Sequence, residues 1–161
     1  MLDLSAAFDT LDYTILLDRL SRYFGFSHKV LRWFSSYRTV RMQSVTIVNK
    51  TTSRRRLEFG VPQGSILGPL LFTLYTAPIQ DIFSAHNPDC MFYADDSQLY
   101  MTIDPHYQLP ALNTLQKCIG EIIEWNIIGK LVCNPSKTEV IQFSSSFVKN
   151  PILSDFLATL V

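Results

Sequence analysis

The chain has 161 residues, enough for one hydrophobic core, and its composition of 47% hydrophobic and 17% charged residues excludes an intrinsically disordered protein. Its 14 basic residues balance 14 acidic ones, and a net charge of zero excludes strong overall attraction to nucleic acid or an anionic membrane. Three cysteines without a CxxC pair and three scattered histidines argue against a disulfide framework or a zinc site, and they favour a reducing compartment.

The spacing of apolar residues predicts helices that alternate with short strands. In chain order we expect a strand end at 2–4, a helix at 14–24, and a second helix that Ser27 caps and that carries Val30, Leu31, Phe34 and Tyr37 on one face. Strands at 42–48 and 55–59 should flank a polar turn at 50–54, and a loop at 60–64 should lead to a helix at 66–83 with Pro69 in its first turn. The remaining expected elements are strands at 89–93 and 98–103, a helix at 109–127, and a strand at 137–144 with Val140 and Ile141 buried. Antiparallel hairpins beside helices are typical of the α+β class.

One uncharged stretch has the length of a membrane span. No charged residue occurs from Phe59 to Gln80, which is long enough to cross a bilayer. Its first third is rich in Gly and Pro, which are costly in a lipid-exposed helix, so we predict no membrane segment. The first residues also lack the basic and apolar regions of a signal peptide, so we expect an intracellular protein, with nucleus and cytoplasm both left open.

Two adjacent carboxylates, Asp95 and Asp96, interrupt the predicted strands in the segment FYADDSQLY. A plain turn is one interpretation, because Asp side chains bond to nearby backbone in turns. Hairpin turns, however, prefer Gly or Asn where a positive φ is needed, and neither is present here. In the alternative, the clustered carboxylates bind Mg²⁺, two ions of which catalyse phosphoryl displacement in many enzymes.

Three other segments carry candidate functional residues. Asp3 lies between two leucines at a strand end, where it is either a third metal ligand or a helix N-cap. The loop that contains Gln63 either contacts a ligand at a helix entrance or merely precedes a core helix. Lys137 is either a solvated surface charge or a proton donor to a leaving pyrophosphate. A basic run could meet phosphates, although a solvated hairpin edge is the commoner role of such a run; it comprises Lys50, Arg54, Arg55 and Arg56.

Four segments occur in the order of the palm motifs of a reverse transcriptase: LDLSAAFDTLD, GVPQGSILGPLLF, YADDSQLY and NPSKTEV. Over residues 2–145 the sequence resembles reverse transcriptases of non-long-terminal-repeat (LINE-type) retrotransposons. The resemblance implies a polymerase palm over residues 1–146, a small antiparallel sheet backed by helices, followed by a C-terminal stub at 147–161. It also implies that fingers and thumb segments, which are largely missing here, belong to a longer parent protein.

The resemblance implies a reaction and a set of roles. In this family an RNA template directs the extension of a DNA primer with deoxynucleoside triphosphates. Asp3, Asp95 and Asp96 would bind two Mg²⁺ ions, with Mn²⁺ as a substitute, and Lys137 would be the general acid. Substrate-binding roles would fall to Phe8, which excludes a ribose 2′-hydroxyl, to Pro62, Gln63 and Gly64, which contact template and nucleotide, and to Tyr93, near the primer end.

Departures from the family pattern keep a second hypothesis open. Tyr13 stands where relatives commonly carry His, and residues 125–130 are less polar than in the family. A palm without clamping segments should hold template and primer poorly, because phosphate contacts supply most of the affinity. We therefore expect this chain alone to be weakly active or inactive, and the alternative is a truncated non-catalytic relic or a domesticated nucleic-acid-binding module.

Overall fold

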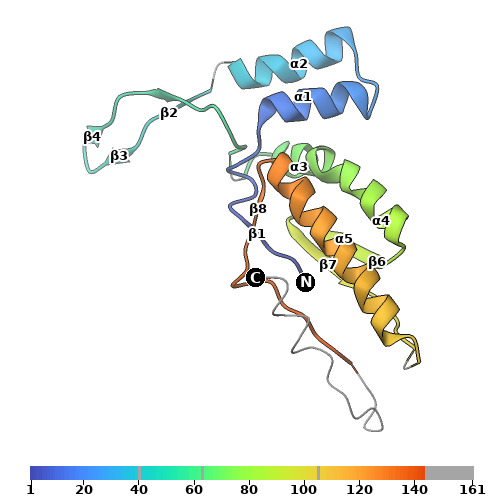
Figure 1. Cartoon of the computed structure of the whole chain (residues 1–161). Helices are drawn as coiled ribbons and strands as arrows, with labels where there is room; N and C mark the ends of the chain where they lie inside the picture. The colour runs from blue at the N-terminus through green and yellow to red at the C-terminus, as the bar shows by residue number, and fades with distance from the viewer. Residues whose placement is uncertain (40, 63, 105, 144–161) are drawn as a thin grey trace. The chain divides into compact units, whose positions relative to one another are not determined.

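The structure is a computed structural model that describes residues 1–39, 41–62, 64–104 and 106–143 (Figure 1). The chain divides into two compact units. We call Met1–Ser5 together with the chain from Ile79 onward the hairpin unit, and Ala6–Pro78 the ribbon unit. The mixture of helices and small antiparallel strand pairs confirms the predicted α+β class.

A β-hairpin gives the hairpin unit its name. Strand β6 (Asp89–Tyr93) pairs antiparallel with β7 (Asp96–Tyr100), and Tyr93 lies opposite Asp96. The connection is the two-residue turn Ala94–Asp95, in which Ala94 has a φ of +55°. The predicted second strand at 98–103 therefore begins earlier and ends earlier than expected. A positive φ at the first turn position is the geometry for which Gly is usually selected, and here Ala adopts it.

The N-terminal segment joins this hairpin to another strand pair. Leu2 and Ser97 exchange two backbone hydrogen bonds of 2.8 and 3.1 Å. Immediately afterwards, β1 (Leu4–Ser5) pairs antiparallel with β8 (Val132–Cys133). The predicted strand end at 2–4 is thus confirmed, and it lies between β7 and β8.

Two helices back these strands. Helix α4 (Gln80–His86) contacts α5 (Gln108–Ile128), which confirms the helix predicted at 109–127. Buried side chains of the two helices form one apolar cluster with Leu2 and with Ile79, which directly precedes α4; the cluster comprises Leu2, Ile79, Phe83, Cys118 and Ile122. Burial raises the pKa of Cys118 to about 11, so its thiol stays neutral and packs as an apolar group. None of the helices in the described part of the chain is both long and apolar enough to cross a bilayer.

Two of the expected regular elements are wrong. The strand predicted at 137–144 is not regular over its described part, 137–143; the strand in this region is β8, and Ile141 is 66% exposed. The helix predicted at 66–83 is interrupted: α3 (Gly68–Thr76) is followed by the 3₁₀ turn Ala77–Ile79 and then by α4. Pro78 explains the interruption, because it has no backbone N–H to donate to the preceding turn. The predicted stub at 147–161 lies outside the described residues.

The described residues of the ribbon unit form the helices α1 (Tyr13–Arg22), α2 (His28–Thr39) and α3, with α1 in contact with both others. Asp12 caps α1 by accepting hydrogen bonds from the backbone of Thr14 and Ile15. The buried residues Leu16 and Leu20 recur at helical spacing, and α3 buries Leu71, Phe72 and Tyr75. Pro69 lies in the first turn of α3, as predicted.

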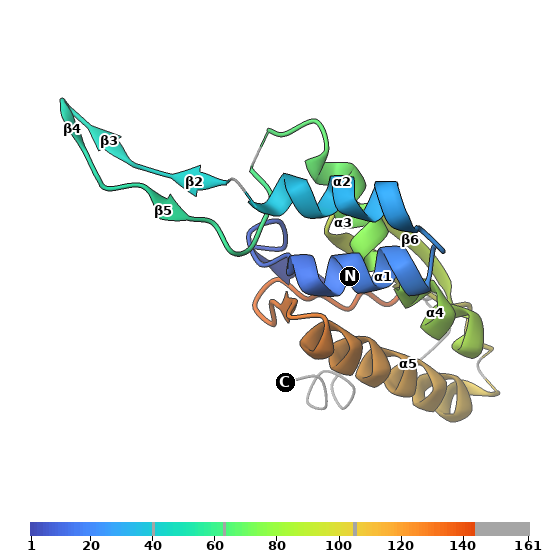
Figure 2. The ribbon, with the colours of Figure 1, turned by 90° about the horizontal axis from the view of Figure 1, so that it is seen from above.

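A two-stranded ribbon projects from the helices of this unit (Figures 1 and 2). Strand β2 (Met42–Gln43) pairs with β5 (Arg55–Arg56), and β3 (Thr46–Ile47) pairs with β4 (Lys50–Thr51). The hairpin turn is Val48–Asn49, so the turn predicted at 50–54 is wrong. Val45 and Ile47 are both exposed on the ribbon.

The base of the ribbon is closed by a polar network. The Tyr13 hydroxyl donates to the Gly60 carbonyl at 2.7 Å, and Arg41 donates to that carbonyl at 3.1 Å and to the Tyr13 oxygen. Burial raises the pKa of Tyr13 despite the nearby Arg41 cation, so the phenol keeps its proton. Gly60 has a φ of +75°, and a Cβ there would lie 2.7 Å from the Asp9 carbonyl oxygen, so no larger residue fits.

Replacing Tyr13 by Phe should lower the free energy of unfolding by about 1–2 kcal/mol, because a buried hydrogen-bonding group loses its partners. Urea denaturation measures the change. Tyr37→Phe is the matched control, because that ring lies 5.3 Å from the Arg41 guanidinium and is retained. Equal destabilisation by the two substitutions would contradict a specific role for the Tyr13 hydroxyl.

Replacing Ala94 by Gly should raise the free energy of unfolding by about 1 kcal/mol, since relief of a non-Gly residue at positive φ outweighs the added chain entropy. Ala94→Val should lower it, because a β-branched residue is an outlier at positive φ. Thermal and urea unfolding of the three proteins give the order. A Gly variant less stable than the parent would show that the turn is not strained.

Candidate active site

Asp3 is a mostly buried acid whose two neighbours are held by strand pairing. Its neighbours Leu2 and Leu4 pair with β7 and β8, and its own carbonyl accepts a hydrogen bond from the Asn134 backbone at 2.8 Å. The side chain is 13% exposed, and its Oδ1 atom has no hydrogen-bond partner among the residues that the structure describes. A buried carboxylate oxygen without a partner is costly, and a cation would satisfy it.

The register brings the Asp3 position opposite the hairpin tip. Leu2 and Ser97 form a hydrogen-bonded antiparallel pair, so the next residues along the same register are Asp3 and Asp96. Residues directly opposite each other in such a pair share a face of the sheet. Asp95 lies in the turn itself, one position further along. The isolated bridge thus places Asp3 and Asp96 on neighbouring segments, each next to the bridged pair, and Asp95 adjoins Asp96 in sequence.

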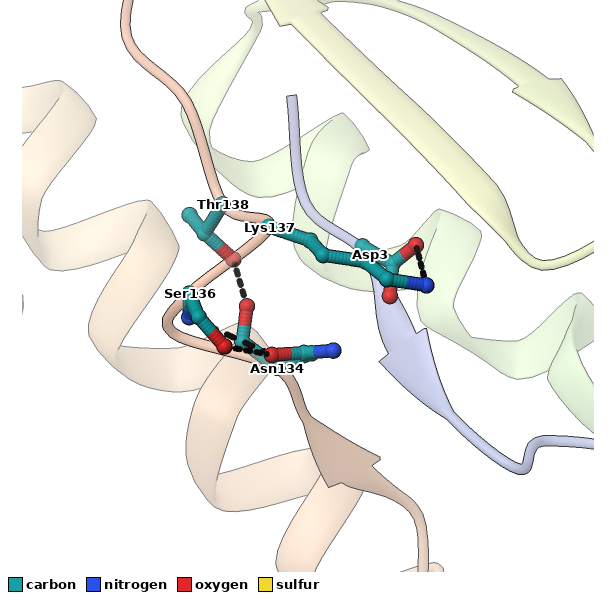
Figure 3. Close-up of polar contacts among 5 residues, drawn as sticks. All are labelled: Asp3, Asn134, Ser136, Lys137 and Thr138. Carbon is teal, nitrogen blue, oxygen red and sulfur yellow. Dashed lines mark hydrogen bonds and ion pairs between the residues drawn. The ribbon is translucent and has the colours of Figure 1, made fainter.

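A compact turn brings Lys137 to Asp3 (Figure 3). Leu4 lies opposite Cys133, and Met1 exchanges backbone hydrogen bonds with Glu139. The N-terminal segment therefore advances three positions between these two contacts, whereas the C-terminal segment advances six. The three extra residues form a turn that Asn134 organises. Its side chain accepts hydrogen bonds from the backbone and hydroxyl of Ser136, and its carbonyl accepts from Thr138. Lys137 Nζ lies 3.8 Å from Asp3 Oδ2 and is 67% exposed.

The residues present fit a hard cation by their chemistry rather than by forming a complete cage. Among residues 1–143, apart from those not described, no three Asp, Glu, His or Cys side chains gather closely enough to hold one ion. Mg²⁺ does not require such a gathering, since it commonly binds through one or two carboxylates and keeps water or substrate phosphates as its other ligands. The unpartnered Oδ1 of Asp3 is the observation that favours a cation here.

The predicted substrate-binding residues fall in both units. Phe8 packs its ring against Phe72 with centroids 4.8 Å apart, and its carbonyl accepts the Val61 N–H at 2.8 Å, which anchors the start of the Gly-rich loop. Pro62 and Gly64 are exposed on that loop. Gln63 lies outside the described residues. Tyr93, in the hairpin unit, is 81% exposed beside the Ala94–Asp95 turn.

Some residues that shape these segments were missed at the level of sequence. The Asn-Pro-Ser triplet signals a side-chain-stabilised turn, and this signal could have identified Asn134 as the residue that positions Lys137. The network of Arg41 with Tyr13 joins distant parts of the sequence and leaves no local signal. The four predicted basic residues, Lys50 and Arg54 to Arg56, are all exposed on the ribbon.

Comparison with known proteins agrees with the motif order. The family described as "Reverse transcriptase (RNA-dependent DNA polymerase)" matches residues 1–149. The "Probable RNA-directed DNA polymerase from transposon BS" of Drosophila melanogaster is 29% identical over 142 residues, which cover 85% of this chain and 15% of that protein. The "RNA-directed DNA polymerase from mobile element jockey" of Drosophila funebris is 26% identical over 150 residues, which cover 90% of this chain and 16% of that protein.

The chain therefore spans only a small part of the length of these curated relatives, 15% of one and 16% of the other. The family match, by contrast, extends over most of the chain, from residue 1 to residue 149. The resemblance predicted from four ordered motifs is thus confirmed: the chain belongs to the reverse transcriptase (RNA-dependent DNA polymerase) family.

Proposed function

We propose that this chain is the palm part, over residues 1–146, of an RNA-directed DNA polymerase that extends a primer by nucleotidyl transfer. One observation carries the proposal. The strand of Asp3 runs between β7, which begins with Asp96, and the turn of Lys137, and it presents a buried carboxylate oxygen without a partner. Acidic groups held on neighbouring strands beside a cationic side chain suit chemistry on an anionic phosphate substrate.

Asp3, Asp95 and Asp96 are the residues that would hold two Mg²⁺ ions, or Mn²⁺ in their place. Such ions supply Lewis-acid stabilisation of the attacking and leaving oxygens in an in-line displacement. The protein's own contribution is positional. Strand pairing fixes the backbone of Asp3 and Asp96, whereas the two-residue turn orients Asp95.

Lys137 has two roles in this proposal. Its ammonium partly neutralises Asp3, and because the side chain is mostly exposed, this pair contributes little to stability. The same ammonium carries a proton, which it can deliver to the oxygen of a leaving pyrophosphate. The Asn134 turn holds it near the acid without burying it.

The remaining proposed roles concern substrates. An RNA template, a DNA primer and a deoxynucleoside triphosphate are the proposed partners. Phe8 would select the deoxyribose, since its ring is fixed by Phe72 and cannot swing aside easily. The loop residues Pro62, Gln63 and Gly64 would contact template and nucleotide, and Tyr93, exposed beside the turn, would lie near the primer end.

A second candidate function is a nucleic-acid-binding module that has no catalytic activity. The exposed basic ribbon favours this candidate, because such a surface needs no metal and no acid to bind phosphates. The two candidates differ in one measurable respect, which is whether the carboxylates matter for nucleotide incorporation.

With Mg²⁺, an RNA template and an annealed DNA primer, we expect at most weak incorporation of deoxynucleotides by this chain, and Asp95→Asn should reduce that incorporation by about 100-fold or more through loss of metal stabilisation. Asp89→Asn, at the exposed far end of the same hairpin, is the control and should leave the rate unchanged. Equal rates for all three proteins would reject the assignment of Asp95. Incorporation by none of them would show that this chain does not polymerise on its own.

Asp3→Asn should separate stability from activity. In the absence of divalent metal the substitution should raise the free energy of unfolding by about 1 kcal/mol, because a neutral amide is cheaper to bury than an unpartnered carboxylate. It should also abolish primer extension. Asp9→Asn, an exposed acid on the following segment, should change neither quantity. A destabilised Asp3→Asn protein would show that the carboxylate is satisfied structurally.

A further inference from the structure

The net charge of zero conceals a strong local asymmetry. Residues 41–57 contain five of the 14 basic residues, Arg41, Lys50, Arg54, Arg55 and Arg56, and none of the 14 acidic ones. All but Arg41 lie on the β2–β5 ribbon, where every residue from 42 to 56 is exposed. None of these four side chains pairs with a carboxylate among the residues that the structure describes. The ribbon is therefore a cationic arm whose charges are free to meet an external anion.

The strand register distributes these charges over both faces of the ribbon. Gln43 lies opposite Arg55 and Met42 lies opposite Arg56, and consecutive residues of a strand point to opposite faces. On the distal part, Ile47 lies opposite Lys50. An anionic surface that meets only one face would therefore leave one of the two arginines unused.

A bulge adds to the twist of the ribbon. The Thr52 N–H donates to the Val45 carbonyl, and the Val45 N–H donates to the Thr52 hydroxyl oxygen. Because Gln43 lies opposite Arg55, the single residue Ser44 then faces two residues, Ser53 and Arg54. A bulge of this kind bends and twists a strand pair and re-aims its side chains. At Arg54 the regular alternation of side chains between the two faces of the ribbon is therefore interrupted.

We propose that the β2–β5 ribbon binds the phosphate backbones of a B-form DNA duplex without sequence preference. A two-stranded ribbon has the width that the major groove of B-form DNA admits, and cations on both faces reach the phosphates that flank the groove on either side. Single strands are commonly held by aromatic stacking, and residues 42–56 contain no aromatic side chain. This inference rests on the charge and shape of the ribbon and uses none of the residues that are proposed to take part in the reaction. It therefore adds a binding surface to the proposed function.

The test measures binding of a fluorescent B-form DNA duplex to the 161-residue chain by anisotropy, over a series of salt concentrations. One variant carries Lys50→Gln, Arg54→Gln, Arg55→Gln and Arg56→Gln. The control removes the same charge from exposed helical positions, with Arg22→Gln, Lys29→Gln, Arg32→Gln and Lys117→Gln. The ribbon variant should lose at least about tenfold in affinity, and its salt dependence should fall by about 0.9 in logarithmic slope for each phosphate contact removed.

The outcomes discriminate between explanations. The proposal is supported if the ribbon variant loses affinity while the control variant binds as well as the parent. Equal losses of affinity in both variants overturn it, because the loss would then follow from total charge and not from the ribbon. Binding of the parent to anionic phosphatidylserine vesicles but not to the duplex would also overturn it. Should the ribbon variant unfold by circular dichroism, Arg55→Gln and Arg56→Gln singly should each lower the slope by about 1. Asp95→Asn should bind like the parent, so a failure of the proposed reaction leaves this result unaffected.

Discussion

The backbone pairing of Leu2 with Ser97 is the contact on which the hairpin unit depends. It joins the β6–β7 hairpin to the strand that continues into the β1–β8 pair, so strands that are distant in sequence form one antiparallel set. The same residue, Leu2, is buried among Ile79, Phe83 and Ile122. Pairing segments that are far apart in sequence costs loop-closure entropy. The burial of Leu2 in the apolar cluster offsets that cost and so stabilises the pairing. Asp3 owes its position to both effects, because it follows Leu2 directly.

The position of Asp3 illustrates a conflict between stability and chemistry. A carboxylate with one unpartnered oxygen beside an apolar core does not favour folding, and Lys137 reaches only the other oxygen. Local disagreements of this kind with folding rules are expected where a protein acts on a ligand. The surrounding structure tolerates the cost because neighbouring backbone pairs hold the strand on both sides. A charged group can therefore remain nearly buried and still be ready for an external cation.

Regular elements could be predicted from sequence wherever one periodicity dominates. Helix α5 has a long apolar stripe, and the hairpin around Asp95 and Asp96 has two β-rich runs, so both were recovered. The ribbon turn was misplaced, because the polar residues 50–54 resemble a turn while Val48 takes a φ of +50°, which its β-branched side chain disfavours. β8 was missed because two residues carry no pattern, and their strand conformation comes from tertiary pairing with β1. Motif order alone supplied the acids proposed for the site, Asp3, Asp95 and Asp96. Their geometry could not be predicted in this way, because the contact of Asp3 with Lys137 joins the two ends of the described chain.

The network of Arg41, Tyr13 and Gly60 has a consequence for how the ribbon can vary. Arg41 stands where the chain leaves the helices and Gly60 stands near where it returns, and the two are bonded to each other and to the buried Tyr13. The junction is therefore closed independently of whatever lies beyond it. Lengthening or shortening a segment whose ends are already fixed changes loop entropy only slowly with length. The ribbon is thus a site at which insertions, deletions and new surface chemistry can be accepted without disturbing the core, which makes it the most evolvable part of its unit.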